Sequence, residues 1–276
     1  NEDYISEISI SGIYSTDMAM LLENITGDAA EVWEVASNYE PSQNIKTSAT
    51  LTAGNSELLT LVVAPPKVGA ATPSDTDGIV YTDCVVTSFS WSGDMSDSGG
   101  LIKYSATLKT YSPALVGIDV SGYTVAAYQL TAAKTLTMAD WQDPQYRLIC
   151  GQADVLLNTF SFNLENDALF LGRASGGIPE VITRGTEFSA TADFNMKFDD
   201  ESADLITMFQ TATTAASTGI TSMSNAATPA TGASWGFKIA GSVFTSVALS
   251  EGDIMAIDAS VKMVGAGAGE STTCLT

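Results

Sequence analysis

Histidine is absent from this chain of 276 residues. Its absence removes the commonest general base, the commonest metal ligand and every Ser-His or Cys-His nucleophile pair. Three cysteines, Cys84, Cys150 and Cys274, occur without a C-x-x-C spacing. Neither a disulfide framework nor a zinc site is therefore indicated. The sequence predicts a protein without enzymatic activity, metal or cofactor.

Basic residues are also scarce: 11 Lys and Arg face 32 Asp and Glu, and the formal net charge is −21. Because binding to phosphates depends on basic side chains, this composition excludes a nucleic-acid binder of the usual kind. A surface of this charge is expected to repel DNA. The same charge would also keep a protein soluble, and a saline environment is a further explanation.

Long apolar runs are missing as well. No stretch of 18 apolar residues occurs, so the sequence predicts no membrane span. Residues 1–10 are acidic and alternate in polarity, unlike a secretory signal or a transit peptide. Since 45% of the residues are apolar and 16% charged, the chain is typical of an ordered globular protein. We expect a soluble protein made in a cytoplasm.

What the sequence does contain is strict alternation of polar and apolar residues. Residues 187–198 read EFSATADFNMKF. One parity is apolar: Phe188, Ala190, Ala192, Phe194, Met196 and Phe198. The other is polar: Glu187, Ser189, Thr191, Asp193, Asn195 and Lys197. At about 3.3 Å per residue, this predicts a two-faced strand of roughly 40 Å, about twice the usual length.

Other segments show the same period of two, which is typical of half-buried strands. They are residues 84–92 (with Phe89 and Trp91 on one face), 101–111 (with Tyr104 opposite Lys103, Ser105 and Thr107), 155–165 (with Phe160 and Phe162 on one face), and 253–264 with its partner 234–249. The Gly-, Asp- and Ser-rich residues 93–100 predict a hairpin loop between the first two segments.

Helix signals are few. Residues 199–211 predict one flanking helix, with Asp199 or Asp200 as N-cap and apolar residues on one side. Residues 15–25 and 28–36 are weaker candidates for short helices. The small-residue segment 212–233 predicts a flexible arm, and residues 265–276 predict a loose C-terminal tail.

A weak internal repeat accompanies the strands: TSFSWS at 87–92 resembles NTFSFN at 158–163, and YSAT at 104–107 resembles FSAT at 188–191. The connection at 164–185 is longer in the second copy and contains a Gly-Gly-x-Pro turn, so we expect it to leave the sheet. Chance matches in a Ser/Thr-rich chain remain an alternative. The chain 1–276 is thus predicted to be one subunit, which the repeat would divide into β halves at 1–135 and 136–276.

Motifs that elsewhere carry chemistry have simpler explanations here. GASWG at 232–236 matches a nucleophile elbow at Ser234, but no histidine can complete the triad. The acidic clusters at 75–78 and 94–97 do not continue into a calcium loop and are explained as turns. The acids at 199–201 precede an apolar helix, which favours capping over acid–base chemistry.

Two stretches in order resemble the tail tube proteins of long-tailed, non-contractile (siphovirus-type) phages and related tailed viruses. They are residues 83–111 and residues 155–202. The family pattern is an SFS strand followed by NLE, a Gly/Pro connection, and a G-x-x-x-S-A-T-x-x-F strand that runs into F-D-D. The two stretches cover about a quarter to a third of the chain, and the pattern is more compositional than invariant.

This resemblance implies a mainly β fold, a tail-tube-type β-sandwich or barrel with long hairpins, one flanking helix and extended loops. It implies a structural virion protein, the major tail tube subunit, whose homo-hexameric rings stack into a hollow conduit for viral DNA ejection. The partners would be other copies of itself and tape measure, tail terminator and distal tail proteins. Viral DNA would pass without specific binding, and the protein would belong to the virion tail after assembly in the host cytoplasm.

Under this hypothesis one polar strand face lines an acidic lumen that offers DNA no counter-ions to displace. The candidate lumen-facing residues are Glu187, Ser189, Thr191, Asp193, Asn195, Lys197, Lys103, Ser105 and Thr107. The candidates for packing in the core or between subunits are Phe89, Trp91, Tyr104, Phe160, Phe162, Phe188, Phe194 and Phe198. The resemblance also implies that each subunit lends a four-stranded sheet to the inner barrel of a six-membered ring. Four such strands can be named here, 84–92, 101–111, 155–165 and 186–198, and this number favours a hexamer of whole chains over a trimer of two-module chains.

Two alternatives stay open from the sequence. The first is a carbohydrate-binding β-sandwich in which Trp91, Trp141 or Trp235 would form a sugar platform. The parity of Trp91 within its strand argues for burial and against that role. The second is a capsid-decoration or surface-layer protein, from which only the geometry of assembly would distinguish a tube subunit.

Overall fold

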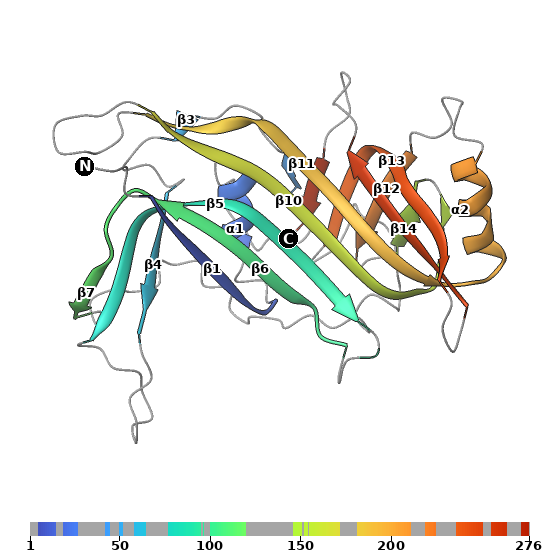
Figure 1. The fold of residues 1–276 in the computed structure, drawn as a ribbon, viewed down its shortest axis with the longest axis horizontal. Coiled ribbons are helices and arrows are strands. Elements are labelled where there is room, and N and C mark those ends of the chain that lie inside the picture. The colour runs from blue at the N-terminus through green and yellow to red at the C-terminus, as the bar shows by residue number, and fades with distance from the viewer. Residues whose placement is uncertain are drawn as a thin grey trace, which may run out of the picture.

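The computed structural model is mainly β, and its strands form one antiparallel network, which confirms the predicted fold class (Figure 1). The structure describes residues 5–14, 19–26, 42–44, 50–51, 58–64, 77–94, 96, 100–119, 146–150, 152–153, 155–171, 181–210, 219–224, 236–250, 255–263 and 272–275.

Ten strands follow one another across the sheet. In spatial order they are β1 (Ser6–Ile13), β6 (Lys103–Thr110), β5 (Gly78–Asp94), β10 (Leu157–Leu171), β11 (Val181–Lys197), β14 (Ala256–Met263), β13 (Gly236–Ser250), β12 (Gly219–Ser224), β8 (Tyr146–Ile149) and β9 (Gln152–Ala153). Five strands pair to the side of this path: β2 (Ser42–Asn44), β3 (Thr50–Leu51), β4 (Leu59–Val63), β7 (Leu115–Ile118) and β15 (Thr272–Leu275).

The long strands are present where alternation predicted them. β5 and β11 have 17 residues each, and β10 and β13 have 15 each. The predicted hairpin of β5 with β6 and the predicted partnership of β13 with β14 are both confirmed by their registers. Alternation is a local property of each segment, and one buried face is enough to select the strand conformation.

The connection at 164–185 was predicted to leave the sheet, and that prediction is wrong for most of it. β10 continues to Leu171 and β11 begins at Val181, with pairs from Ala168↔Arg184 to Leu171↔Val181. Apolar and β-branched residues supply the strand propensity in both extensions. The β10–β11 hairpin is therefore longer than predicted.

Two segments expected to be loose contribute strands. Gly219–Ser224, inside the predicted flexible arm 212–233, forms β12 between β13 and β8. Thr272–Leu275, inside the predicted tail 265–276, forms β15 beside β13 and β2. These expectations were wrong for those residues because the pairing partners lie far away in the sequence. The remainder of both segments lies outside the described residues.

The predicted flanking helix is α2 (Asp200–Gln210). Asp199 is its N-cap: Ser202 N–H donates to Asp199 Oδ1 at 3.0 Å, and Ser202 Oγ accepts from Asp199 N–H at 2.9 Å. A second helix, α1 (Ala19–Thr26), falls within the weaker candidate 15–25. The other candidate, 28–36, lies outside the described residues.

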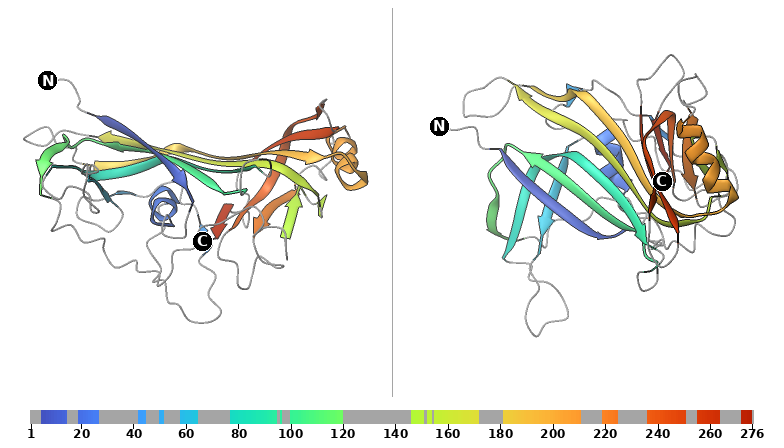
Figure 2. Two further views of the ribbon diagram at one scale, coloured as in Figure 1. Left: turned by 90° about the horizontal axis from the view of Figure 1, so that it is seen from below. Right: turned by 45° about the vertical axis from the view of Figure 1, so that its right-hand side comes forward.

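Helix α1 lies against one face of the sheet (Figure 2, left). Val86 N–H donates to Asn24 Oδ1 at 2.6 Å, and Asn166 Nδ2 donates to the carbonyl of Ile25 at 2.9 Å. Both asparagines are buried. Because buried amide groups need partners, these two bonds orient the helix over β5 and β10.

The core under α1 is rich in aromatic side chains. Trp91 is fully buried and packs against Tyr14, Phe89 and Phe162, with ring centroids 5.3, 5.1 and 5.5 Å away. Phe162 in turn stacks on Phe237 of β13 at 4.1 Å. The aromatic cluster therefore joins residues from β5, β10, β13 and the end of β1 into one hydrophobic core.

The first pair of matching sequence segments lies side by side. Trp91 of β5 is directly opposite Phe162 of β10, and the neighbouring pairs are Ser90↔Asn163 and Ser92↔Ser161. Trp91 and Phe162 hold the same position within TSFSWS and NTFSFN. The two matching segments therefore run antiparallel and cross at this pair. The second pair of matching segments, YSAT and FSAT, is not placed equivalently. Tyr104 lies opposite Trp91, but Phe188, its counterpart, does not lie opposite Phe162, which pairs with Ala192.

Candidate functional site

Among the described residues, no group of three or more His, Cys, Asp or Glu is placed to hold a metal ion. In that part of the chain, neither helix is long and apolar enough to cross a membrane. Ser234 and Asp75 lie outside the described residues.

Two cysteines are buried as free thiols, Cys84 and Cys150. Burial raises the pKa of the Cys84 thiol to about 11 and also raises the pKa of the Cys150 thiol. Cys150 sits beside two hydroxyls, with Sγ 3.7 Å from both Thr221 Oγ1 and Ser242 Oγ, and Cys150 N–H donates to Thr221 at 3.1 Å. This contact ties the end of β8 to β12 and β13, which is a structural role.

We predict that both thiols react slowly in the folded protein. A pKa of about 11 in place of 9.0 leaves about 100-fold less thiolate at Cys84 near pH 8, so alkylation by iodoacetamide should be at least about 100-fold slower than in urea and should accelerate as the pH rises toward 11. Mass spectrometry of a Cys274→Ser variant measures this for the two buried cysteines alone. Native labelling as fast as in urea would contradict their placement.

The most extensive candidate surface is one face of the sheet, here called the polar face. It runs over six neighbouring strands. Val85 and Ala256, which the register places on the same side opposite Lys109 and Lys197, are buried, and the solvent-accessible residues are polar. They are Glu7, Ser9 and Ser11 (β1); Lys103, Ser105, Thr107 and Lys109 (β6); Ser88, Ser90, Ser92 and Asp94 (β5); Thr159, Ser161, Asn163, Glu165 and Asp167 (β10); Ser189, Thr191, Asp193, Asn195 and Lys197 (β11); and Asp258, Ser260 and Lys262 (β14).

None of these side chains is buried. The register aligns them in rows across the strands: one row runs from Ser11 through Ser105, Ser90, Asn163 and Thr191 to Lys262. Period-two alternation places every second residue of each strand on this face, and correct register keeps the rows continuous. The polar face ends in apolar residues at Ile13 on β1 and at Leu169 and Leu171 on β10, which are 42–49% exposed.

Side-chain hydrogen bonds cross the strands on this face. Asn158 Nδ2 donates to Asn195 Oδ1 at 2.8 Å, and Asn195 Nδ2 donates to Asp258 Oδ1 at 2.6 Å. Ser161 Oγ donates to Asp193 Oδ2 at 3.2 Å. These contacts link β10, β11 and β14 and hold their polar groups in fixed positions.

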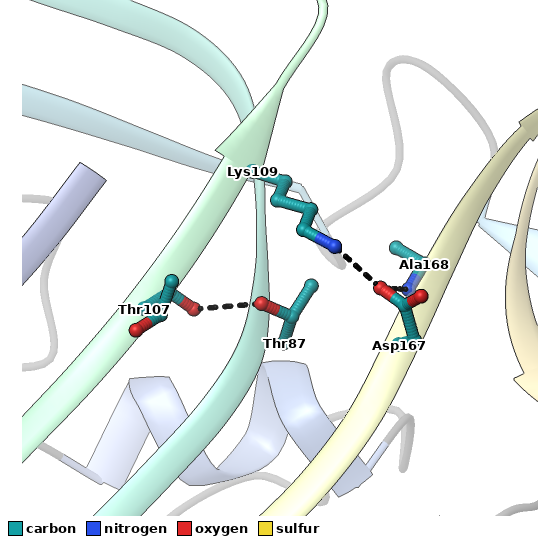
Figure 3. Close-up of polar contacts among 5 residues, drawn as sticks. All are labelled: Thr87, Thr107, Lys109, Asp167 and Ala168. Carbon is teal, nitrogen blue, oxygen red and sulfur yellow. Dashed lines mark hydrogen bonds and ion pairs between the residues drawn. The ribbon is translucent and has the colours of Figure 1, made fainter. Parts of the chain in front are cut away.

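An ion pair bridges a wider gap on the same face. Lys109 Nζ of β6 lies 2.7 Å from Asp167 Oδ1 of β10, so the lysine reaches across β5 (Figure 3). Nearby, Thr87 Oγ1 donates to the carbonyl of Thr107 at 3.3 Å. Both partners of the ion pair are partly exposed, so we expect it to contribute about 1 kcal/mol or less.

Charge on the polar face is nearly balanced. Six carboxylates (Glu7, Asp94, Glu165, Asp167, Asp193 and Asp258) accompany four ammonium groups (Lys103, Lys109, Lys197 and Lys262), a net charge of −2 for the described residues. The whole chain carries −21. Most of the acidity therefore belongs to other parts of the chain, and the polar face is hydroxyl- and amide-rich with a small excess of negative charge.

The two faces of the sheet differ in what covers them. Figure 2 (left) shows α1 beneath the sheet, and no described helix or strand crosses the opposite side. On the α1 side the strands bury Phe160, Phe162, Phe194, Met196 and Val261. The sheet is therefore a single layer with a covered apolar face and an open polar face over its described part.

The candidate site residues fall on these faces as follows. Ser189, Thr191, Asp193, Asn195, Lys197, Lys103, Ser105 and Thr107 all lie on the polar face. Phe89, Trp91, Phe160, Phe162 and Phe194 are buried, and Tyr104 is half-buried. Phe198 is 38% exposed just beyond β11. The side chains of Glu187 and Phe188 lie outside the described residues.

The burial of Trp91 removes it from any sugar-binding platform. Trp141 and Trp235 lie outside the described residues. The sequence did not predict that β1, β5, β10 and β14 also contribute residues to the polar face. Their alternation was visible in each segment, but nothing local indicated that these strands are neighbours.

No protein-family model and no curated protein matches this chain. A search of solved structures finds a similar chain described as "Virion of native gene transfer agent (GTA) particle". The similarity covers 49% of this chain and 96% of that chain, with 14% sequence identity and a TM-score of 0.32. The function is therefore inferred from this chain's own residues.

Proposed function

We propose that this chain is a structural virion protein, a tail tube subunit whose copies form stacked rings around a channel for viral DNA. The observation that carries the proposal is the polar face, a polar surface over six strands backed by a buried apolar face. The subunit would act by shape and surface chemistry and not by catalysis.

A conduit needs a wall to which DNA does not adhere. Affinity for the phosphate backbone comes mainly from basic side chains that release counter-ions. The described polar face has a net charge of −2, because its six carboxylates outnumber its four lysines. Serine, threonine and asparagine supply the rest of the surface, so a duplex would meet hydrated groups without a basic track.

The strand count bears on the size of the ring. The four strands named from the sequence are indeed consecutive, in the order β6-β5-β10-β11, but β1 extends one side and β14 and β13 extend the other. More than four strands per chain thus share the polar face. We propose a ring of whole chains, and the end view in the electron microscope counts its copies.

Negative-stain electron microscopy of the purified protein tests the proposal. Hollow rings or stacked tubes are expected, with the end view showing an open centre. A monodisperse monomer of 28.8 kDa at high protein concentration would contradict it. A flat two-dimensional lattice would instead support a surface-layer protein.

A further inference from the structure

Two strand edges that border the polar face are open among the described residues, and the first is β1. Among the described residues β1 pairs only with β6. Tyr14 N–H donates to the carbonyl of Ile102 at 2.8 Å, directly after the pair Ile13↔Lys103. Because hydrogen-bonded and non-bonded pairs alternate in an antiparallel ladder, the backbone N–H groups of Ser9 and Ser11 point away from β6, toward the open side.

The second open edge is the final part of β13. Its first part, Gly236–Ser242, is paired by β12 on the side away from β14. Residues Thr245–Ser250 pair only with β14 among the described strands. Helix α2 reaches β13 at Phe244, where Phe209 packs with a centroid distance of 6.4 Å, and so contacts the strand just before this edge begins.

The two edges carry few of the features that protect free strands from pairing. β1 reads SEISISGI, with one charged residue, no lysine, no proline and no register shift against β6. Thr245–Ser250 reads TSVALS and has no charge, and its pairing with β14 is regular after a register shift at Thr245. Edge strands that stay unpaired are usually shortened, charged or interrupted by proline or bulges. These two edges are therefore suited to pairing with another strand.

The faces of the two edges also correspond. On β1, Ser9 belongs to the polar face, whereas Ile8 and Ile10 are half-buried on the other side. On β13, the register with β14 puts Ser246, Ala248 and Ser250 in line with the polar face and Val247 and Leu249 on the other side. Leu249 is 52% exposed, so Ile8 and Ile10 of a neighbouring strand would cover it.

We infer that β1 of one copy pairs with Thr245–Ser250 of the next copy, in parallel orientation. The direction follows from strand order: six antiparallel steps separate β1 from β13, so the two strands point the same way. Copies related by a ring rotation keep that common direction. This inference rests on the proposed function and adds the seam through which the subunits join.

Cysteine cross-linking tests the seam. In a Cys274→Ser background, Ser9→Cys is combined with Ser246→Cys, Ala248→Cys or Ser250→Cys, and diamide serves as oxidant. One combination should give a ladder of disulfide-linked multimers, in multiples of 28.8 kDa on non-reducing gels. Because the pairing is parallel, Ser11→Cys should then link two residues later in β13 than Ser9→Cys does.

A proline variant gives an independent readout. Ser9→Pro removes an N–H group that points away from β6, so the fold should survive while ring assembly falls at least about tenfold by size-exclusion chromatography. Ser9→Ala keeps that N–H and should assemble like the parent. Unchanged far-UV circular dichroism shows that the proline variant has folded.

The outcomes separate the seam from the proposed function. Dimers from Ser9→Cys alone would mean that β1 pairs with a second β1 about a two-fold axis, and the seam would be wrong. Rings in the microscope without any ladder, or with Ser9→Pro assembling normally, would also overturn the seam while the tube proposal stands. Absence of both rings and ladder would overturn both.

Discussion

Replacing Trp91 by alanine is expected to lower the free energy of unfolding by about 3–5 kcal/mol, the range typical of a large aromatic side chain removed from a packed core. Trp91 is fully buried and contacts three rings: Phe89 of the same strand, and Tyr14 and Phe162 from two other segments. Its removal would leave a cavity under α1. Urea denaturation followed by circular dichroism measures the loss.

The matched control is Ser92→Ala, the next residue of β5. Ser92 is exposed on the polar face, so its replacement should change the free energy of unfolding by no more than about 0.5 kcal/mol. Trp91→Phe should fall between the two because it keeps part of the ring contacts. A loss below about 1 kcal/mol for Trp91→Ala would show that this tryptophan is not at the centre of the core.

Reversing two charges on the polar face is expected to raise the affinity of this surface for DNA. The double variant Asp193→Lys, Asp258→Lys changes the charge of the described polar face from −2 to +2 per chain. In the proposed ring every copy would carry that change. Assembled tubes should then bind a short duplex at least about tenfold more tightly at 50 mM salt, with most of the gain lost by 200 mM.

Nuclease protection locates the bound DNA. With the polar face lining the channel, the duplex held by this variant should resist nuclease. Asp193→Asn, Asp258→Asn removes the same carboxylates without adding bases and should retain little DNA. Asp204→Lys, on the exposed side of α2, is the outer-surface control and should give no protection. Equal digestion in all variants would contradict a polar face that lines a channel.

Local pattern was enough to predict the long strands, as residues 187–198 illustrate. The alternation that ends at Lys197 identified both faces of β11: Ala190, Ala192, Phe194 and Met196 are buried, and Asp193 and Lys197 are exposed. Such patterns are readable because successive side chains in a strand point to opposite faces. The N-cap at Asp199 was predictable for a similar local reason.

Pairing between distant segments was not predictable in the same way. β1 joins β6 across about ninety residues of chain, and β14 joins β11 on the other side of the hairpin. Gly219–Ser224 looks like a linker by composition, yet it pairs with both β13 and β8, and Thr221 is buried there. In such segments tertiary contacts override weak local propensity.

The sequence by itself determined the chemical character of this protein: no histidine, few bases, a charge of −21 and strands with one polar and one apolar side. Only the tertiary structure decided that six strands align their polar sides into one surface with a net charge of −2, and that β1 and the end of β13 each pair on one side only among the described strands. The physical reason is that alternation sets the two sides of each strand, whereas the order and register of neighbours depend on long-range pairing.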